Sequence, residues 1–211
     1  MTVLPQLEER LTDAVRRSHV QTGRMPRRRR GRRVVLAFAA MLVVSATALA
    51  ATQPWTSLDD AVDHGQRPPA PDRSLPVLGA PGTESLAQFR GKVVVLSFFA
   101  SWCEPCQRQA PLLDQTGRQL TQDGVGAALL VNWRDTPEAA TAFVASRGLT
   151  MPVLTDDDGL LAHHYAVQGL PETFVIDTEG RVVAISRQLA TRQFLDAAIA
   201  KARQQPAPDQ N

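Results

Sequence analysis

The sequence predicts an α/β fold with a mixed central sheet and helices on both faces, preceded by one N-terminal transmembrane helix. Three observations support this prediction. Apolar, β-rich segments alternate with helical patterns over residues 92–148. Two more strand patterns follow near the C-terminus, separated by a short turn and succeeded by a last helix. An uncharged stretch of 18 residues, 34–51, precedes all of them.

The formal net charge of +2 conceals an uneven distribution of charge along the chain. Residues 1–33 contain ten Arg and three acidic residues, which gives this arm a net charge of +7. The rest of the chain has 13 basic and 18 acidic residues, a net charge of −5. The basic isoelectric point therefore reflects the arm, and a nucleic-acid partner is not expected.

Residues 34–51, VVLAFAAMLVVSATALAA, predict a transmembrane anchor. As a helix they would cover roughly 27 Å, just enough to span the hydrocarbon core of a bilayer. Six Arg between 27 and 33 precede them, so the positive-inside rule predicts a cytoplasmic arm at 1–33 and an extracytoplasmic catalytic domain. A cleaved secretory signal ending near 48–50 and a buried core helix are the alternatives. The long N-terminal arm and the Arg cluster favour a single-pass protein of the cell membrane.

The remaining chain divides into three predicted parts. Residues 52–72 are rich in proline and predict an extended linker. Residues 73–203 hold the strand and helix patterns of the folded domain. Residues 204–211 predict a disordered tail.

The first half of the domain predicts the order strand, helix, strand, helix. The continuous apolar segments 92–100 and 124–132 are typical of strands that are covered on both faces. Between them, 104–122 predicts a helix that contains Pro111. Residues 136–148 predict the second helix, because a Thr N-cap, a Pro at the first helical position and a Gly stop delimit it.

The second half predicts an antiparallel end to the sheet. Residues 151–156 form a short extended segment, and 159–167 a short helix. ETFVID (172–177) and RVVAIS (181–186) then predict a hairpin. A last helix over 191–203 closes the domain, with its apolar side toward the sheet.

The chain contains two Cys, in the sequence Trp102-Cys103-Glu104-Pro105-Cys106, at the exit of a predicted strand and the start of a predicted helix. A sulfur at a helix N-terminus lies near unpaired N–H groups and the positive end of the dipole, which stabilises its thiolate. Cys103 is therefore the predicted nucleophile. Cys106 is near enough to attack a mixed disulfide at Cys103, and we expect its sulfur to be the more buried of the two.

A structural disulfide and a metal site are the alternatives for this pair. A ring closed over two residues would stabilise the fold little, because disulfide stabilisation grows with loop length. A zinc site needs four ligands, and the adjacent His163 and His164 would point in different directions on a helix. For these two His and for Tyr165, packing or solvent exposure is the better interpretation. The redox interpretation of the Cys pair is favoured.

The segment FRGKVVVLSFFASWCEPC (89–106) and the motif GLPETF (169–174) resemble the TlpA/ResA/CcmG group of thioredoxin-like proteins. The resemblance covers about 74–200. These proteins are membrane-tethered and reduce disulfides outside the bacterial cytoplasm. The resemblance implies that Pro171 is cis and packs across from the two sulfurs, and that Leu170 presents its backbone to a bound peptide.

The resemblance also implies partners and a set of site residues. The Pro-Glu-Thr-Phe form is similar to the cytochrome c maturation members, so disulfide-containing extracytoplasmic proteins, apocytochrome c among them, are the expected clients. A membrane thiol-reducing donor would restore the dithiol. The two sulfurs carry the chemistry, so no cofactor beyond the Cys103–Cys106 disulfide is expected. The expected client-binding residues are Trp102, Glu104, Pro105, Leu170 and Pro171.

Two departures from the wider family concern acidic residues. Thioredoxins carry a buried Asp six positions before the first Cys, where this chain has Ser97. Several relatives have Glu three residues after the second Cys, where this chain has Gln109. Glu172 is the expected catalytic substitute as proton acceptor. Glu104 should oppose thiolate formation modestly.

Three other functions share some of these features. An oxidase or isomerase of secreted proteins differs in reduction potential, about −120 mV for an oxidant against about −250 mV or below for a reductant. A copper metallochaperone of related fold would space its cysteines by three residues and add a His. A peroxidase would show Thr-x-x-Cys at the helix start, which this chain lacks.

Overall fold

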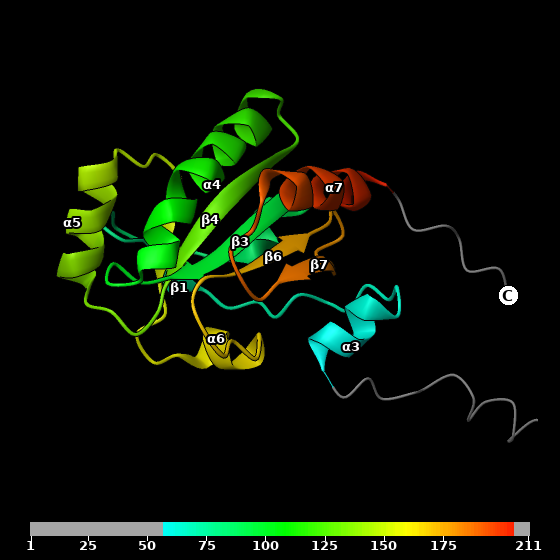
Figure 1. Ribbon diagram of the computed structural model, residues 1–211, viewed down its shortest axis with the longest axis horizontal. Helices are drawn as coiled ribbons and strands as arrows, with labels where there is room; N and C mark the ends of the chain where they lie inside the picture. The colour runs from blue at the N-terminus through cyan, green and yellow to red at the C-terminus, as the bar shows by residue number, and fades with distance from the viewer. Residues whose placement is uncertain (1–56, 205–211) are drawn as a thin grey trace, which may run out of the picture. The chain divides into compact units, whose positions relative to one another are not determined.

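The computed structural model describes residues 57–204, and their centre is a five-stranded mixed sheet with the order β5-β4-β3-β6-β7 (Figure 1). Strands β3 (Val93–Phe99), β4 (Gly126–Asn132) and β5 (Val153–Thr155) are parallel. Strands β6 (Glu172–Ile176) and β7 (Val182–Ser186) continue the sheet in antiparallel pairing. The mixed sheet predicted from the sequence is confirmed.

Strand β3 is the centre of the sheet, paired with β4 on one side and β6 on the other. Val95 lies opposite Ala128 of β4 and Val175 of β6. All seven residues of β3 are buried, because both faces of the strand are covered. This explains why its sequence, apart from Ser97, is apolar throughout instead of alternating.

Helices cover both faces of this sheet (Figure 1). One core contains side chains from α4 (Glu104–Gln122), α5 (Pro137–Arg147) and α7 (Arg192–Arg203). The core on the other face contains side chains from α3 (Leu58–Asp63), the 3₁₀ helix η2 (Leu86–Phe89) and α6 (Leu160–His164). A small two-stranded sheet, β1 (Leu75–Pro76) with β2 (Thr83–Glu84), precedes η2.

Helix α5 is bounded by the caps that the sequence predicts. The Thr136 hydroxyl accepts a hydrogen bond from the Ala139 N–H at 3.2 Å, and Pro137 is the first helical residue. Gly148 ends the helix in the left-handed conformation at φ 58°, which is energetically unfavourable for a residue with a Cβ.

Helix α4 lies close to the sheet at Gly117. A Cβ at this position would come 2.8 Å from the Cβ of Ala128 on β4, closer than side chains pack. The absence of a side chain at 117 therefore sets how closely α4 approaches β4. The predicted Pro111 lies inside this helix.

The structure describes residues 57–72 of the predicted extended linker (52–72), and part of this segment is helical. Residues 58–63 form α3, capped by the Ser57 hydroxyl, and Ala61 on this helix is 1% exposed. Arg67 forms an ion pair with Asp177, and Pro69 bridges to Arg181. Residues 58–63 are therefore helical where the sequence predicted extended backbone, because apolar and charged contacts attach this part of the chain to β7 and its turn.

The predicted arm at 1–33, the predicted transmembrane segment at 34–51 and the tail beyond Gln204 lie outside the described residues. Within residues 57–204, none of the helices combines the length and the apolar character that a bilayer crossing requires.

Candidate active site

Cys103 and Cys106 form a disulfide at the start of α4. Cys103 is the N-cap of this helix and has extended backbone, and its sulfur accepts a hydrogen bond from the Cys106 N–H at 3.2 Å. Strand β3 ends at Phe99, so a short turn connects the centre of the sheet to the cysteines. This is the geometry that the sequence predicts, with the first sulfur at the positive end of a helix dipole.

The two cysteines are almost equally buried, with 4% of Cys103 and 3% of Cys106 exposed. In the disulfide form Cys106 is thus the more buried residue of the two, by one per cent. The N–H donated to Cys103 is what distinguishes the two sulfurs, because a hydrogen bond to the thiolate stabilises the charged form.

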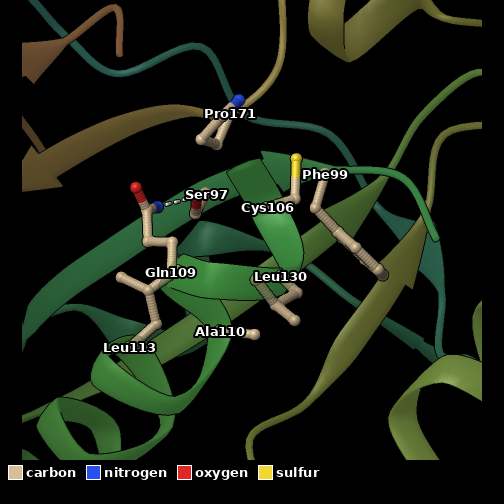
Figure 2. A pocket seen from close by; sticks show the side chains of 8 residues that line it. All are labelled: Ser97, Phe99, Cys106, Gln109, Ala110, Leu113, Leu130 and Pro171. Carbon is tan, nitrogen blue, oxygen red and sulfur yellow. Dashed lines mark hydrogen bonds between the residues drawn. The ribbon is translucent and has the colours of Figure 1, made fainter. Parts of the chain in front are cut away.

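Pro171 lies across from the cysteines, after a cis Leu170–Pro171 peptide bond, as the resemblance implied. Figure 2 shows Pro171 at the same end of a pocket as the Cys106 sulfur. The pocket lies between β3, α4, β4 and the start of β6. Its lining residues are Ser97, Phe99, Cys106, Gln109, Ala110, Leu113, Leu130 and Pro171.

A neutral hydrogen-bond network forms the polar wall of this pocket. The Gln109 amide donates to the Thr173 hydroxyl at 3.0 Å and to the Ser97 hydroxyl at 3.3 Å. The two hydroxyls are 2.9 Å apart, and the Gln109 carbonyl accepts from the Ala190 N–H at 2.6 Å. Ser97 and Gln109, the two departures from the acidic pattern of the family, thus belong to one network. Thr173, its third side chain, was not identified from the sequence.

Glu172 lies on the other face of the sheet, which contradicts its predicted role as proton acceptor at the sulfurs. Neighbouring residues of a strand point to opposite faces, and Thr173 points toward Gln109. The buried Glu172 carboxylate pairs with Arg187 instead. Its other oxygen accepts from the Gln168 and Gly169 N–H groups, both at 3.0 Å.

Arg187 forms ion pairs with two carboxylates, those of Glu172 and of Asp59. Partial burial lowers the pKa of the Arg187 guanidinium, but hydrogen bonds to Asp59 and Glu172 outweigh this effect and raise it. The hydrogen bond from Arg187 lowers the pKa of the Asp59 carboxyl. Both groups are therefore charged at neutral pH. No local sequence pattern indicates this cluster.

The expected client-binding residues beside the cysteines have different environments. Trp102 is 62% exposed, and its indole N–H donates to the Arg134 carbonyl at 2.9 Å. Glu104 is an exposed side chain that pairs with Arg108 one turn along α4. Pro105 is partly buried within the first turn. The ring of Trp102 is the largest apolar surface that this segment exposes.

The loop that carries Arg134 is fixed by Asp135, which the sequence analysis did not identify. The Asp135 carboxylate accepts from the Ser101 N–H at 2.6 Å and from the Thr136 N–H at 2.9 Å. It therefore connects the turn before the cysteines to the start of α5. An Asp directly before the Thr-Pro helix start was the available signal.

The residues considered for a metal site are not brought together. His163 and His164 are exposed on α6, with ring centroids 6.1 Å apart. Tyr165 is fully buried and packs on Phe98 and Phe174. Over the part of the chain that the structure covers, 57–204, no three His, Cys, Asp or Glu side chains are placed to hold a metal ion.

The sheet order, the Cys pair at the start of α4 and the cis-proline opposite define a thioredoxin-like protein. The chain belongs to the AhpC/TSA family, whose model matches residues 67–185.

Individual relatives of this chain indicate a narrower class of protein than the family does. The thiol:disulfide interchange protein HelX of Rhodobacter capsulatus is 40% identical over 116 residues, 54% of this chain and 63% of HelX. The thiol-disulfide oxidoreductase ResA of Bacillus subtilis is 35% identical over 110 residues, 52% of this chain and 61% of ResA. The matches thus span less than two thirds of these two relatives. They confirm the resemblance to TlpA/ResA/CcmG-type thiol-disulfide oxidoreductases.

A solved structure shows the same fold. A candidate thiol:disulfide interchange protein DsbE from Chlorobium tepidum superposes with a TM-score of 0.59 and 30% identity. The match covers 64% of this chain and 96% of that chain.

Proposed function

We propose that this chain is a membrane-anchored, extracytoplasmic thiol:disulfide oxidoreductase that reduces disulfides in client proteins. One observation carries the proposal: Cys103 and Cys106 are joined at the N-terminus of α4, with a backbone N–H on the first sulfur and Pro171 across from the pair. The similarity to HelX and ResA supports the same reaction class.

The reaction begins with the reduced protein. The Cys103 thiolate attacks one sulfur of a client disulfide, forms a Cys103–client disulfide and releases the other client sulfur as a thiolate. The Cys106 N–H and the positive end of the α4 dipole stabilise negative charge on the attacking sulfur.

Cys106 completes the cycle. Its thiolate attacks the Cys103 sulfur, which re-forms the Cys103–Cys106 disulfide and releases the client as a dithiol. Two electrons and two protons have then moved from the protein to the client. A membrane thiol-reducing donor returns two electrons to the pair, so the two sulfurs suffice and no cofactor takes part.

The proposed clients include apocytochrome c. This choice is supported by the Pro-Glu-Thr-Phe motif at 171–174 and by the similarity to HelX and ResA. The haem-attachment sequence Cys-x-x-Cys-His supplies a vicinal pair that oxidises readily outside the cytoplasm, and haem attachment needs it reduced.

The proposed location follows from the N-terminal sequence. The uncharged residues 34–51 and the Arg cluster before them support a single-pass anchor with the catalytic domain outside the cytoplasm. An anchor of this kind would keep the cysteine pair near a membrane donor.

Trapping of a covalent intermediate tests this function. The full-length Cys106→Ala variant cannot resolve the mixed disulfide, so it should accumulate bonded to its client through Cys103, and mass spectrometry should identify the client. Cys103→Ala is the matched control and should trap nothing. Capture of apocytochrome c peptides would support the proposed client, whereas equal capture by both variants would refute the assignment of Cys103 as nucleophile.

The direction of electron flow needs a separate measurement. Equilibration of the pair with glutathione buffers gives its reduction potential. A value of about −250 mV or below supports a reductant, and one near about −120 mV would make the chain an oxidase of secreted proteins.

A further inference from the structure

Arg187 joins three segments that are far apart in the sequence. It follows β7 directly, and its Nε donates to Asp59 of α3 at 2.9 Å. Another nitrogen of the same guanidinium pairs with Glu172, the first residue of β6. The guanidinium also donates to the carbonyls of Tyr165 and Ala166, both at 3.3 Å, just after α6.

These contacts fix the segment that leads to Pro171 from both of its ends. Arg187 binds the carbonyls at its start, residues 165 and 166. Glu172, itself paired with Arg187, binds the N–H groups of Gln168 and Gly169 at its end. The backbone between α6 and β6, which contains Leu170 and Pro171, is therefore held by one cation and its partner carboxylate.

The guanidinium is well suited to this role. Its planar fork can bind one carboxylate along one edge while other N–H groups reach a second carboxylate and two carbonyls. It also lies over the Phe174 ring, 5.1 Å from the centroid, which fixes its plane. An ammonium group in its place would lack this geometry.

Asp59 makes α3 part of the arrangement. Glu172 is 2% exposed and needs the Arg187 cation, so the Arg187–Glu172 pair should persist in any folded variant that keeps both residues. Asp59 is more exposed and neutralises the opposite edge of the guanidinium. Its removal would free that edge and weaken the attachment of α3 without unpairing the buried carboxylate.

We propose that Arg187 is a positioning residue for client binding, and that Asp59 on α3 sets its position. This inference rests on the proposed function, in which Leu170 and Pro171 meet the client. Helix α3, which lies within the predicted linker, would then act on client affinity, while the chemistry at Cys103 and Cys106 stays the same.

Single-turnover kinetics of the pre-reduced full-length protein test the inference with two substrates, each in excess over the protein. One is an oxidised Cys-x-x-Cys-His peptide, which must bind along Leu170 and Pro171. The other is the small disulfide 5,5′-dithiobis(2-nitrobenzoic acid), which needs only the cysteines. The dithiol supplies the two electrons, and KM and kcat here denote the substrate concentration at half-maximal rate and the maximal rate of that turnover. Asp59→Asn should raise KM for the peptide at least about threefold, with kcat and the rate for the small disulfide unchanged. Asp59→Glu should restore KM.

The matched control is Asp63→Asn, an exposed aspartate on the same helix, which should leave both rates unchanged. An unchanged peptide KM in Asp59→Asn would overturn the inference. An equal loss of rate with both substrates would also overturn it, because that would show a general distortion of the cysteine site.

Hydrogen exchange provides a readout that does not depend on activity. In Arg187→Lys the amides of Gln168 and Gly169 should exchange faster than in the wild type, while those of α4 keep their rates. Unchanged exchange at both amides would overturn the positioning role. Failure of the wild type to react with either disulfide would instead refute the proposed function. The hydrogen-exchange result would still report on the positioning role, because it does not depend on activity.

Discussion

Gln109 and Ser97 are in hydrogen-bond contact, 3.3 Å between amide nitrogen and hydroxyl oxygen, in the wall of the pocket that Cys106 lines. At these two positions the resemblance to the family implied carboxylates, and here two neutral side chains bind each other (Figure 2). Both also contact the Thr173 hydroxyl. The polar wall next to Cys106 is therefore uncharged.

Gln109→Glu should make stability depend on pH. Burial raises the pKa of the new carboxyl above that of the unfolded chain, so the folded state holds the extra proton and stability falls as pH rises toward the folded pKa. The loss should reach about 1–3 kcal/mol at pH 8 and be much smaller at pH 4, just below the unfolded Glu pKa of about 4.3. Urea unfolding at both pH values measures it. The exposed Gln122→Glu on the same helix is the control, and identical losses at both pH values would contradict the prediction.

Gly117→Ala should destabilise the fold although Ala favours helices. Its Cβ would clash with Ala128, which costs about 1–3 kcal/mol against a helix-propensity gain of about 1 kcal/mol. In an Ala128→Gly background the clash is removed, so the same substitution should become neutral or stabilising. Thermal unfolding of the four members of this double-mutant cycle measures the coupling. Additive effects would show that α4 does not approach β4 this closely.

Asp158→Asn should lose stability only above acidic pH. A hydrogen bond from Arg73, and then one from the Leu160 N–H, lower the pKa of the Asp158 carboxyl to about 2. A carboxyl whose pKa is lowered by folding stabilises the protein above its unfolded pKa of about 3.9, and this contribution disappears as pH falls toward the folded pKa. The wild type and the variant should therefore differ at pH 6 and converge near pH 2. Asp157→Asn at the exposed neighbouring position is the control, and an equal loss of stability at pH 6 in both variants would contradict the prediction.

Trp102→Ala should weaken client binding and leave the fold intact. The ring is 62% exposed, so its removal changes little packing, yet an exposed aromatic beside the cysteines is a typical binding anchor. KM for an oxidised peptide should rise about 5–20-fold, with thermal stability nearly unchanged. Trp102→Phe keeps a ring but loses the N–H that donates to the Arg134 carbonyl. Its KM should therefore lie between those of the wild type and Trp102→Ala. An unchanged KM in Trp102→Ala would exclude the ring from the client site.

Most of the fold could be predicted because its elements carry local signals. The fully buried β3, apolar except for Ser97, and the capped α5 were predicted within about one residue of their ends. Burial on both faces and the Thr136 and Gly148 caps leave direct signals in the sequence. The cysteine pair and Pro171 were found for the same reason, because their spacing and flanking motifs are local.

The remaining features depend on contacts between distant segments. Helix α3 has six residues in a proline-rich region, and its stability comes from packing against β7 rather than from its own pattern. Glu172 was assigned to the wrong face because a strand pattern fixes alternation but not which face meets the cysteines. Arg187 follows Glu172 by 15 residues, and no local signal connects them.

The most direct test of the central claim is electron transfer between the fully reduced protein and an oxidised Cys-x-x-Cys-His peptide, followed by mass spectrometry of both. The protein should lose two hydrogens at Cys103 and Cys106 while the peptide gains two, and the Cys103→Ser/Cys106→Ser double variant should transfer none. Reduction of the peptide by the double variant at the wild-type rate, or a reduced wild type that leaves the peptide oxidised in every buffer, would contradict the claim.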